Sequence, residues 1–182
     1  MNSEVKIGGF GGQGVILAGI IIGKAATIYD RKNAVLTQSF GPEARGSSCG
    51  AQLIISDDVI LYPYVKTPNV LVVISQDAYN RFEPELAPNG TLLFESELIK
   101  PKKSRDGIKM YSIPATRFAE ELGRKMVLNI VMVGFFTAVT SLLSKEAVRK
   151  SVADSVPRGT EELNLKAFEK GYEYGLTEGE KH

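Results

Sequence analysis

A glycine-rich loop near the N-terminus is the first place where this sequence could bind a ligand. Gly9, Gly11 and Gly14 have the G-x-G-x-x-G spacing, with Gly12 and Gln13 between them. We expect a strand over residues 5–9 before the loop and a helix over residues 12–31 after it. Glycines let backbone N–H groups approach an oxygen-rich ligand, and the N-terminus of a helix favours phosphate. Phosphate or diphosphate binding is therefore one interpretation.

Two other interpretations of the glycine loop remain open. The glycines could instead allow tight packing between strand and helix, or they could bind NAD or FAD. A dinucleotide site also needs an acidic residue at the end of the second strand, where it holds the ribose hydroxyls. The second expected strand, residues 34–40, ends in Gln38, Ser39 and Phe40, and Asp30 precedes that strand. The missing acid argues against a nicotinamide cofactor.

The segment that follows the second strand is the most distinctive part of the sequence. Residues 41–48 read GPEARGSS, and their glycines and proline predict a turn from which Glu43 and Arg45 project. An arginine there could bind a carboxylate or phosphate through two parallel hydrogen bonds. Alternatively, Glu43 and Arg45 pair with each other and only shape the loop. We expect Cys49 to be a small buried residue, because no neighbouring group is evident that would lower the pKa of its thiol.

Few side chains in this sequence are able to perform chemistry by themselves. The chain has 182 residues, one Cys, one His (the C-terminal His182) and no Trp. One cysteine excludes an intrachain disulfide and a four-thiolate iron–sulfur cluster. One terminal His argues against a zinc site with Cys and His ligands and against a nucleophile–His relay. We therefore expect no catalytic and no metal-binding residue in this chain.

The net charge and the N-terminal sequence limit the partners of the chain. A formal net charge of +1 predicts no general attraction to nucleic acid or to an anionic membrane. No long apolar stretch opens the sequence, so no secretory signal is evident and a cytoplasmic protein is expected.

Strand and helix patterns alternate through the first two thirds of the chain. This order predicts an α/β fold with a mostly parallel or mixed sheet, helices on both faces, a Rossmann-like start and a helical C-terminal third. We expect one domain over residues 1–182. Further strands are expected over residues 49–56, 69–75, 91–95 and 108–113. Further helices are expected over residues 77–86 (capped by Asp77), 115–123, 127–143, 145–154 and 160–174.

Two of the expected helices, residues 12–31 and 127–143, are apolar on nearly every side. A helix of this kind is normally buried. For the second of them, burial in the centre of the domain, burial against another protein chain and a membrane span are the three interpretations. The second segment is shorter than the roughly 20 residues that a span needs. Two such helices also make a homodimer of the isolated chain plausible.

The two glycine-containing motifs together resemble a known family. Residues 9–15 (GFGGQGV) and 37–46 (TQSFGPEARG) are similar to the gamma subunits of 2-oxoacid:ferredoxin oxidoreductases, most of all to the 2-oxoglutarate type. The same domain occurs fused within pyruvate:ferredoxin oxidoreductases and in indolepyruvate oxidoreductase beta subunits. The resemblance continues through Tyr62-Pro63, residues 75–79 and Asn129. Ser47 departs from the pattern, since many relatives have a second glycine there.

The resemblance implies a role in oxidative decarboxylation of a 2-oxoacid. The family converts 2-oxoacid, coenzyme A and oxidised ferredoxin into acyl-CoA, carbon dioxide and reduced ferredoxin. Thiamine diphosphate lies between the alpha and beta subunits, and iron–sulfur clusters lie in the beta or delta subunit. The gamma subunit carries neither, so its partners would be those subunits and, indirectly, ferredoxin.

The leading hypothesis is that this chain, which binds no cofactor alone, helps to position coenzyme A, a substrate of the complex. The candidate cofactor-binding residues are Gly9, Gly11, Gly12, Gln13, Gly14, Glu43 and Arg45. In this hypothesis the chain completes the complex and positions the diphosphate of coenzyme A. A purely structural assembly subunit and a free-standing nucleotide-binding oxidoreductase are the alternatives, and the 2-oxoacid pocket is expected in other subunits.

Overall fold

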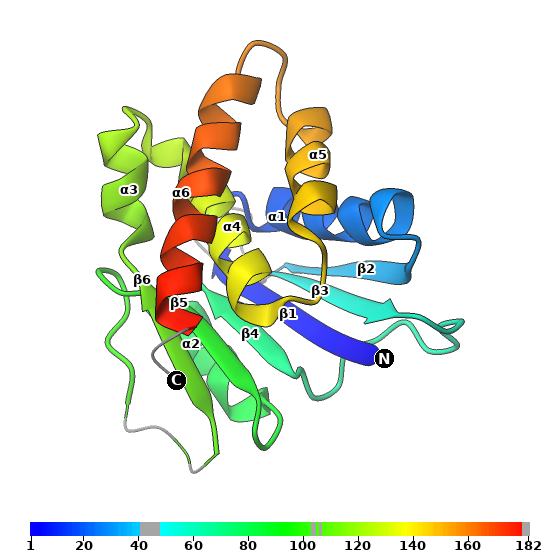
Figure 1. Ribbon diagram of the computed structural model, residues 1–182. Coiled ribbons are helices and arrows are strands. Elements are labelled where there is room, and N and C mark those ends of the chain that lie inside the picture. The colour runs from blue at the N-terminus through cyan, green and yellow to red at the C-terminus, as the bar shows by residue number, and fades with distance from the viewer. Residues whose placement is uncertain (41–47, 103–104, 106, 180–182) are drawn as a thin grey trace.

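A computed structural model describes residues 1–40, 48–102, 105 and 107–179, which form a layered α/β structure around one mixed sheet (Figure 1). The sheet has six strands in the order β2-β3-β1-β4-β5-β6. The strands are β1 (Asn2–Phe10), β2 (Asn33–Phe40), β3 (Ser48–Ser56), β4 (Val70–Val73), β5 (Thr91–Glu95) and β6 (Lys109–Ile113).

Strand direction divides the sheet into two parts. β1, β4, β5 and β6 run parallel, whereas β3 is antiparallel to both of its neighbours, β1 and β2. The expected mixed sheet and Rossmann-like start are thus confirmed, with one antiparallel strand inserted beside β1. β4, which is the short apolar run expected in the middle of the sheet, is buried at all four positions.

The helices cover the two faces of the sheet unequally. One face carries five helices, and the other carries α2 with the short helix η2. The helices are α1 (Val15–Lys24), α2 (Gln76–Phe82), α3 (Ala115–Glu121), α4 (Leu128–Thr140), α5 (Lys145–Ser155) and α6 (Glu161–Gly179). Shorter helical segments are η1 (Ala25–Tyr29), η2 (Glu83–Glu85) and η3 (Lys125–Val127).

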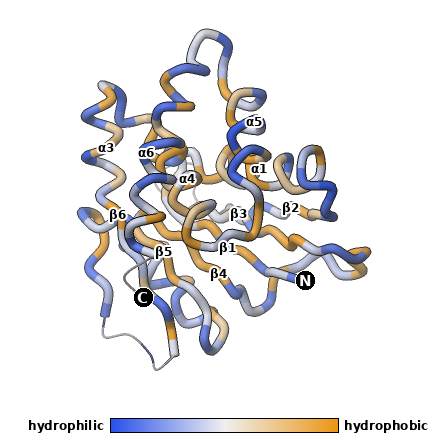
Figure 2. Tube along the Cα trace, in the orientation of Figure 1, coloured by the Kyte–Doolittle hydropathy of each residue, from blue (hydrophilic) through white to orange (hydrophobic). Residues whose placement is uncertain are grey.

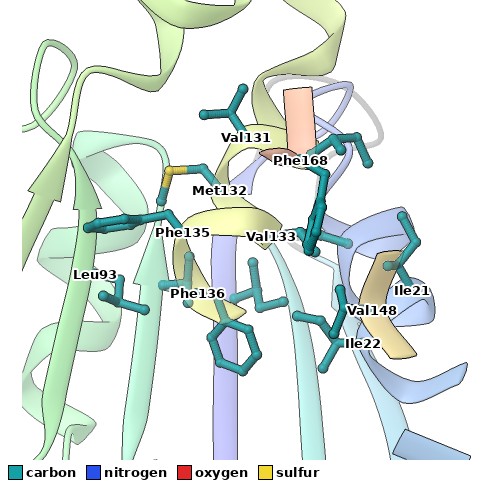
Figure 3. Close-up of a cluster of buried hydrophobic side chains, with 14 of the residues drawn as sticks. Ile21, Ile22, Leu93, Val131, Met132, Val133, Phe135, Phe136, Val148 and Phe168 are labelled. Carbon is teal, nitrogen blue, oxygen red and sulfur yellow. The ribbon is translucent and has the colours of Figure 1, made fainter. Parts of the chain in front are cut away.

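α4 is the central helix of the larger layer, lying between the sheet and α6. Ten consecutive residues of α4, from 128 to 137, are buried. Figure 3 shows Leu93 of β5 near Phe135 of α4, whose ring also lies beside Tyr174 of α6. Phe136 borders a small void together with Ile7 of β1 and Val72 of β4. Figure 2 shows hydropathy alternating along α6, which has solvent on its outer side. Burial within the domain is therefore the correct interpretation of the apolar helix expected over residues 127–143.

α4 and α6 lie so close together that their backbones nearly touch. A Cβ atom added to Gly171 of α6 would lie 1.9 Å from the carbonyl oxygen of Val131. One added to Gly134 of α4 would lie 2.1 Å from the carbonyl oxygen of Phe168. Only glycine allows this approach, so both positions are fixed by packing.

The other face of the sheet has a smaller core under α2. Ala78 and Phe82 of α2 pack on Gly8 of β1, where a Cβ atom would lie 2.7 Å from the Phe82 ring. The Ser75 hydroxyl caps α2 by accepting a hydrogen bond from the Ala78 amide at 3.1 Å. The expectation that Asp77 caps this helix is wrong, because Ser75 precedes the first turn and has the extended backbone of a cap.

The first helix differs from the single helix expected over residues 12–31. α1 begins at Val15 and continues at Ala25 as the wider π-helical turn η1. Its inner side is buried, but Ile20 and Ile28 are 36% and 57% exposed. Among the described residues, no helix is long and apolar enough to cross a membrane.

Candidate functional site

The glycine loop joins the end of β1 to the start of α1, where the parallel strands have their carboxyl ends. Gly12 and Gly14 have left-handed backbones, with φ of 89° and 75°. The N–H groups of Gly11, Gly12 and Gly14 donate no hydrogen bond to any described residue. A Cβ atom on Gly11 or Gly12 would meet nothing within 4 Å. This part of the loop is open, and free N–H groups next to a helix N-terminus suit an anion.

The remaining residues of the loop are held by packing and hydrogen bonds. A Cβ atom on Gly9 would lie 2.6 Å from Ile74. The Gln13 side chain accepts from the Phe10 amide at 2.6 Å and donates to the Ile74 carbonyl at 3.1 Å. The tight-packing interpretation therefore describes Gly9, and Gln13 fixes the loop to the segment that follows β4. A ligand would meet Gly11 and Gly12 first.

The second motif joins the sheet at the same edge. Glu43 and Arg45 lie outside the described residues, but the strands on either side are described. Phe10 pairs with Ser48 in the β1–β3 ladder, and Phe40 pairs with Cys49 in the β2–β3 ladder. Ser48 therefore lies beside Phe10 at the end of β1, and Phe40 lies one strand further away at the same edge of the sheet. The register places the described residues on either side of this segment at the same edge of the sheet as the glycine loop.

A cavity of about 210 Å³ opens next to the glycine loop. Gly12, Gly14 and Leu17 form one side, and the opposite side comes from the N-terminal ends of α4 and α6 with the turn before α4. Three helices thus begin around one cavity. Because each helix N-terminus carries a partial positive charge, the cavity favours a ligand with anionic groups at its mouth.

Three polar side chains of this cavity were missed in the sequence analysis as ligand-binding candidates. Arg124 is exposed at the rim and forms no ion pair with a described residue. Asn129 and Asn164 are only 4% and 7% exposed. Asn129 interrupts an apolar helix, and an amide in that setting is a sign of a specific hydrogen bond. Asn164 lies in a polar helix and gave no such signal.

Both asparagines use their amide nitrogen within the protein. Asn129 donates to the Gly14 carbonyl oxygen at 3.2 Å, and Asn164 donates to the carbonyl oxygen and hydroxyl of Thr160 at 2.9 and 3.1 Å. Their side-chain oxygens accept no hydrogen bond from the described part of the chain. Asn129 also borders a small void in the core, but that void is lined by apolar atoms. Both side chains line the cavity.

Reactive groups are scarce at this edge of the sheet. Cys49 is buried, and burial raises the pKa of its thiol, so the thiol stays protonated at neutral pH. Its expected burial is confirmed. Among the residues that the structure describes, no group of three or more His, Cys, Asp or Glu side chains is arranged to hold a metal ion. With one cysteine in the sequence, the donor set does not fit an iron–sulfur cluster.

Comparison with known protein families shows to which family the chain belongs. The model of the pyruvate ferredoxin/flavodoxin oxidoreductase family matches residues 4–174. The chain belongs to this family. Residues 4–174 include the glycine loop, residues 41–48 and the cavity.

Individual members of the family are similar over nearly their whole length. A protein of Methanocaldococcus jannaschii named 2-oxoglutarate synthase subunit KorC is 48% identical, over 95% of this chain and 94% of the relative. Pyruvate synthase subunit PorC of the same organism is 34% identical, over 93% and 94%. The crystal structure of a keto/oxoacid ferredoxin oxidoreductase gamma subunit from Geobacter sulfurreducens PCA is 39% identical, with a TM-score of 0.86 over 96% of this chain and 99% of that chain.

Proposed function

We propose that this chain is the gamma subunit of a 2-oxoglutarate:ferredoxin oxidoreductase. The observation that carries the proposal is the 48% identity, over nearly the full length of both chains, with a relative named as a subunit of 2-oxoglutarate synthase. The lower identity of 34% with the pyruvate synthase subunit favours 2-oxoglutarate over pyruvate as the substrate of the complex. Residues 1–182 would form one domain of a cytoplasmic complex, inactive without its partners.

The chemistry of the reaction would reside in the other subunits. An iron–sulfur cluster needs more cysteines than the one in this sequence, and the described residues that line the cavity include no His, Cys, Asp or Glu. Alpha, beta and delta subunits would supply thiamine diphosphate and the clusters and pass electrons to ferredoxin. This chain would contribute by positioning a reactant, because holding two reactants in the right geometry lowers the entropic part of the barrier.

The reactant that this chain would hold is coenzyme A. Its diphosphate would lie on the open N–H groups of Gly11 and Gly12 at the N-terminus of α1. Arg45, whose loop starts at the same edge, would add a bidentate contact to a phosphate. Gly9, Gln13 and Gly14 would act indirectly, because they hold the loop in shape.

Steady-state kinetics of the reconstituted complex tests this role. Arg45→Ala should raise the KM for coenzyme A by about tenfold or more, because a hydrogen bond between charged groups contributes about 1.5–3 kcal/mol. Gly11→Ala should do the same, since its added methyl group meets nothing in the protein but would crowd a bound phosphate. The KM for 2-oxoglutarate should change little in both variants. Arg117→Ala, which removes an exposed arginine paired with Glu97, is the control.

Unchanged coenzyme A dependence in both variants would reject the coenzyme A role. The remaining function would then be assembly, which one observation favours independently. Residues 59–64 carry four strongly exposed apolar or aromatic side chains: Val59, Leu61, Tyr62 and Tyr64, at 77%, 93%, 53% and 57% exposure. Patches of this composition are typical of protein–protein contacts.

Co-purification separates the assembly role from the coenzyme A role. Leu61→Asp should weaken retention of the other subunits, and Lys66→Asp, which lies beside the patch and over the Tyr62 ring, tests whether charge alone is responsible. Retention of all partners by the Leu61→Asp subunit would exclude this surface from the interface.

A further inference from the structure

The strand β2 forms one edge of the sheet, and its outer side is unpaired within the described part of the chain. β2 pairs with β3 at all eight of its residues, from Asn33 to Phe40. Alternate residues of an antiparallel strand turn their N–H and C=O groups to the same side, so about half of these groups face away from β3. No other described element bonds to them. Figure 1 shows β2 at the edge of the sheet next to α1.

β2 lacks the features that normally protect an edge strand. Stable monomers protect such strands with a charge, a proline, a bulge or a short length. The opposite edge, β6, fits this rule, because it has five residues and an exposed Lys109. The eight residues of β2, NAVLTQSF, include no charge and no proline, and they pair with β3 one to one without a bulge. β2 is therefore an edge that another strand can extend.

The helix that packs on β2 adds apolar surface beside this edge. Ile22 of α1 faces the centre of the sheet, where it borders a void together with Ile7 and Val72. At about 100° per residue, Ile16 and Ile20 lie on the other side of α1, toward the β2 edge. Ile20 is 36% exposed. The unpaired strand and the apolar side of α1 thus form one continuous surface.

We infer that β2 pairs antiparallel with β2 of a second copy of this chain, so that one sheet runs through two molecules. A two-fold axis perpendicular to the sheet would place the α1 helices side by side, with apolar Ile20 in both. Because β2 is uncharged, no like charges meet along the paired strands. Arg31 and Lys32, just before β2, lie at opposite ends of the pair in an antiparallel arrangement. The pairing is independent of the proposed function, because neither the glycine loop nor residues 59–64 take part.

Analytical ultracentrifugation of the full chain tests this pairing. Over a range of concentrations, the parent chain should approach twice the mass of the single chain. Thr37 lies near the middle of β2, close to the two-fold axis, so Thr37→Lys and Thr37→Glu each bring like charges together. Each variant alone should dissociate with a constant about fivefold higher than that of the parent. An equimolar mixture of the two should recover the dimer, because opposite charges then meet, and a misfolded variant could not do this. Lys109→Glu changes a charge at the other edge and should dimerise as the parent does.

Hydrogen exchange shows where the two copies meet. The outward amides of residues 33–40 should exchange slowly in the concentrated parent chain and quickly in Thr37→Lys, whereas β6 should exchange equally in both. A parent chain that stays monomeric, or a mixture of the Thr37 variants no more dimeric than either alone, would overturn the inference. Protection of β2 that appears only in the complete complex would also overturn it, because another subunit would then occupy the edge.

Discussion

The contact between α4 and α6 predicts a strong effect of one added methyl group. In Gly171→Ala the new Cβ atom would lie 1.9 Å from the Val131 carbonyl oxygen, whereas real Cβ atoms essentially never come closer than 3.0 Å. The helices would have to separate by about 1 Å, which a close-packed interior resists. Because α4 is buried between α6 and the sheet, the separation would disturb both of its contacts.

The expected size of the effect follows from two opposing contributions. Alanine is better than glycine in a helix by about 1 kcal/mol, which favours the variant. Overpacking typically costs about 1–3 kcal/mol and more where backbone must move, as here. We expect a net loss of about 2 kcal/mol in the free energy of unfolding. For a chain of this size the corresponding fall in Tm is about 4–8 °C.

Urea denaturation of the chain, followed by circular dichroism, measures this difference. Gly23→Ala on α1 is the matched control, because its Cβ atom would find only an ordinary contact, 3.5 Å from Leu53. That variant should be as stable as the parent or more stable, by up to about 1 kcal/mol. A Gly171→Ala chain with unchanged or increased stability would refute the close approach of α4 and α6.

Three further predictions concern single side chains. Ser75→Ala should cost about 1 kcal/mol in unfolding free energy, because it removes the cap on the Ala78 amide. A hydrogen bond from Lys32 lowers the pKa of Asp57 from 3.8 to about 2. The stability difference between the parent and Asp57→Asn should therefore persist above about pH 4 and disappear as the pH falls through about 2, in unfolding curves at several pH values. Cys49 should react slowly with iodoacetamide in the native state and rapidly in urea, as measured by mass spectrometry.

Much of the fold could be predicted because local patterns and tertiary structure agree. The apolar run of β4 and the alternation of strands and helices gave the α/β class and the covered sheet. The position of β3 could not be predicted in this way. Pairing with β1 and β2 depends on contacts between distant residues, such as Gly9 with Cys49, which hydropathy does not encode.

The candidate site was predictable only where it depends on motifs. The glycine loop was found from its spacing, but spacing alone did not separate open Gly11 from packed Gly9. That distinction depends on Ile74, which is far away in the sequence. Asn164 was missed for the same reason. Its position in the lining of the cavity depends on how α6 packs beside α4 and the glycine loop.

The antiparallel strand β3 also has a consequence for attempts to change the ligand of this domain. In dinucleotide-binding folds, the acidic residue that hydrogen-bonds the ribose lies at the carboxyl end of the second strand, which is parallel and adjacent to the first strand. In this protein the strand in that position next to β1 is β3. Because β3 is antiparallel to β1, its N-terminal residue, Ser48, lies next to the glycine loop. On this side of β1, the nearest strand with its carboxyl end at this edge is β2, and β3 separates it from β1. A Ser39→Asp substitution would therefore not create an NAD site. The strand order keeps this residue too far from the glycine loop, so adding the acidic side chain is not enough.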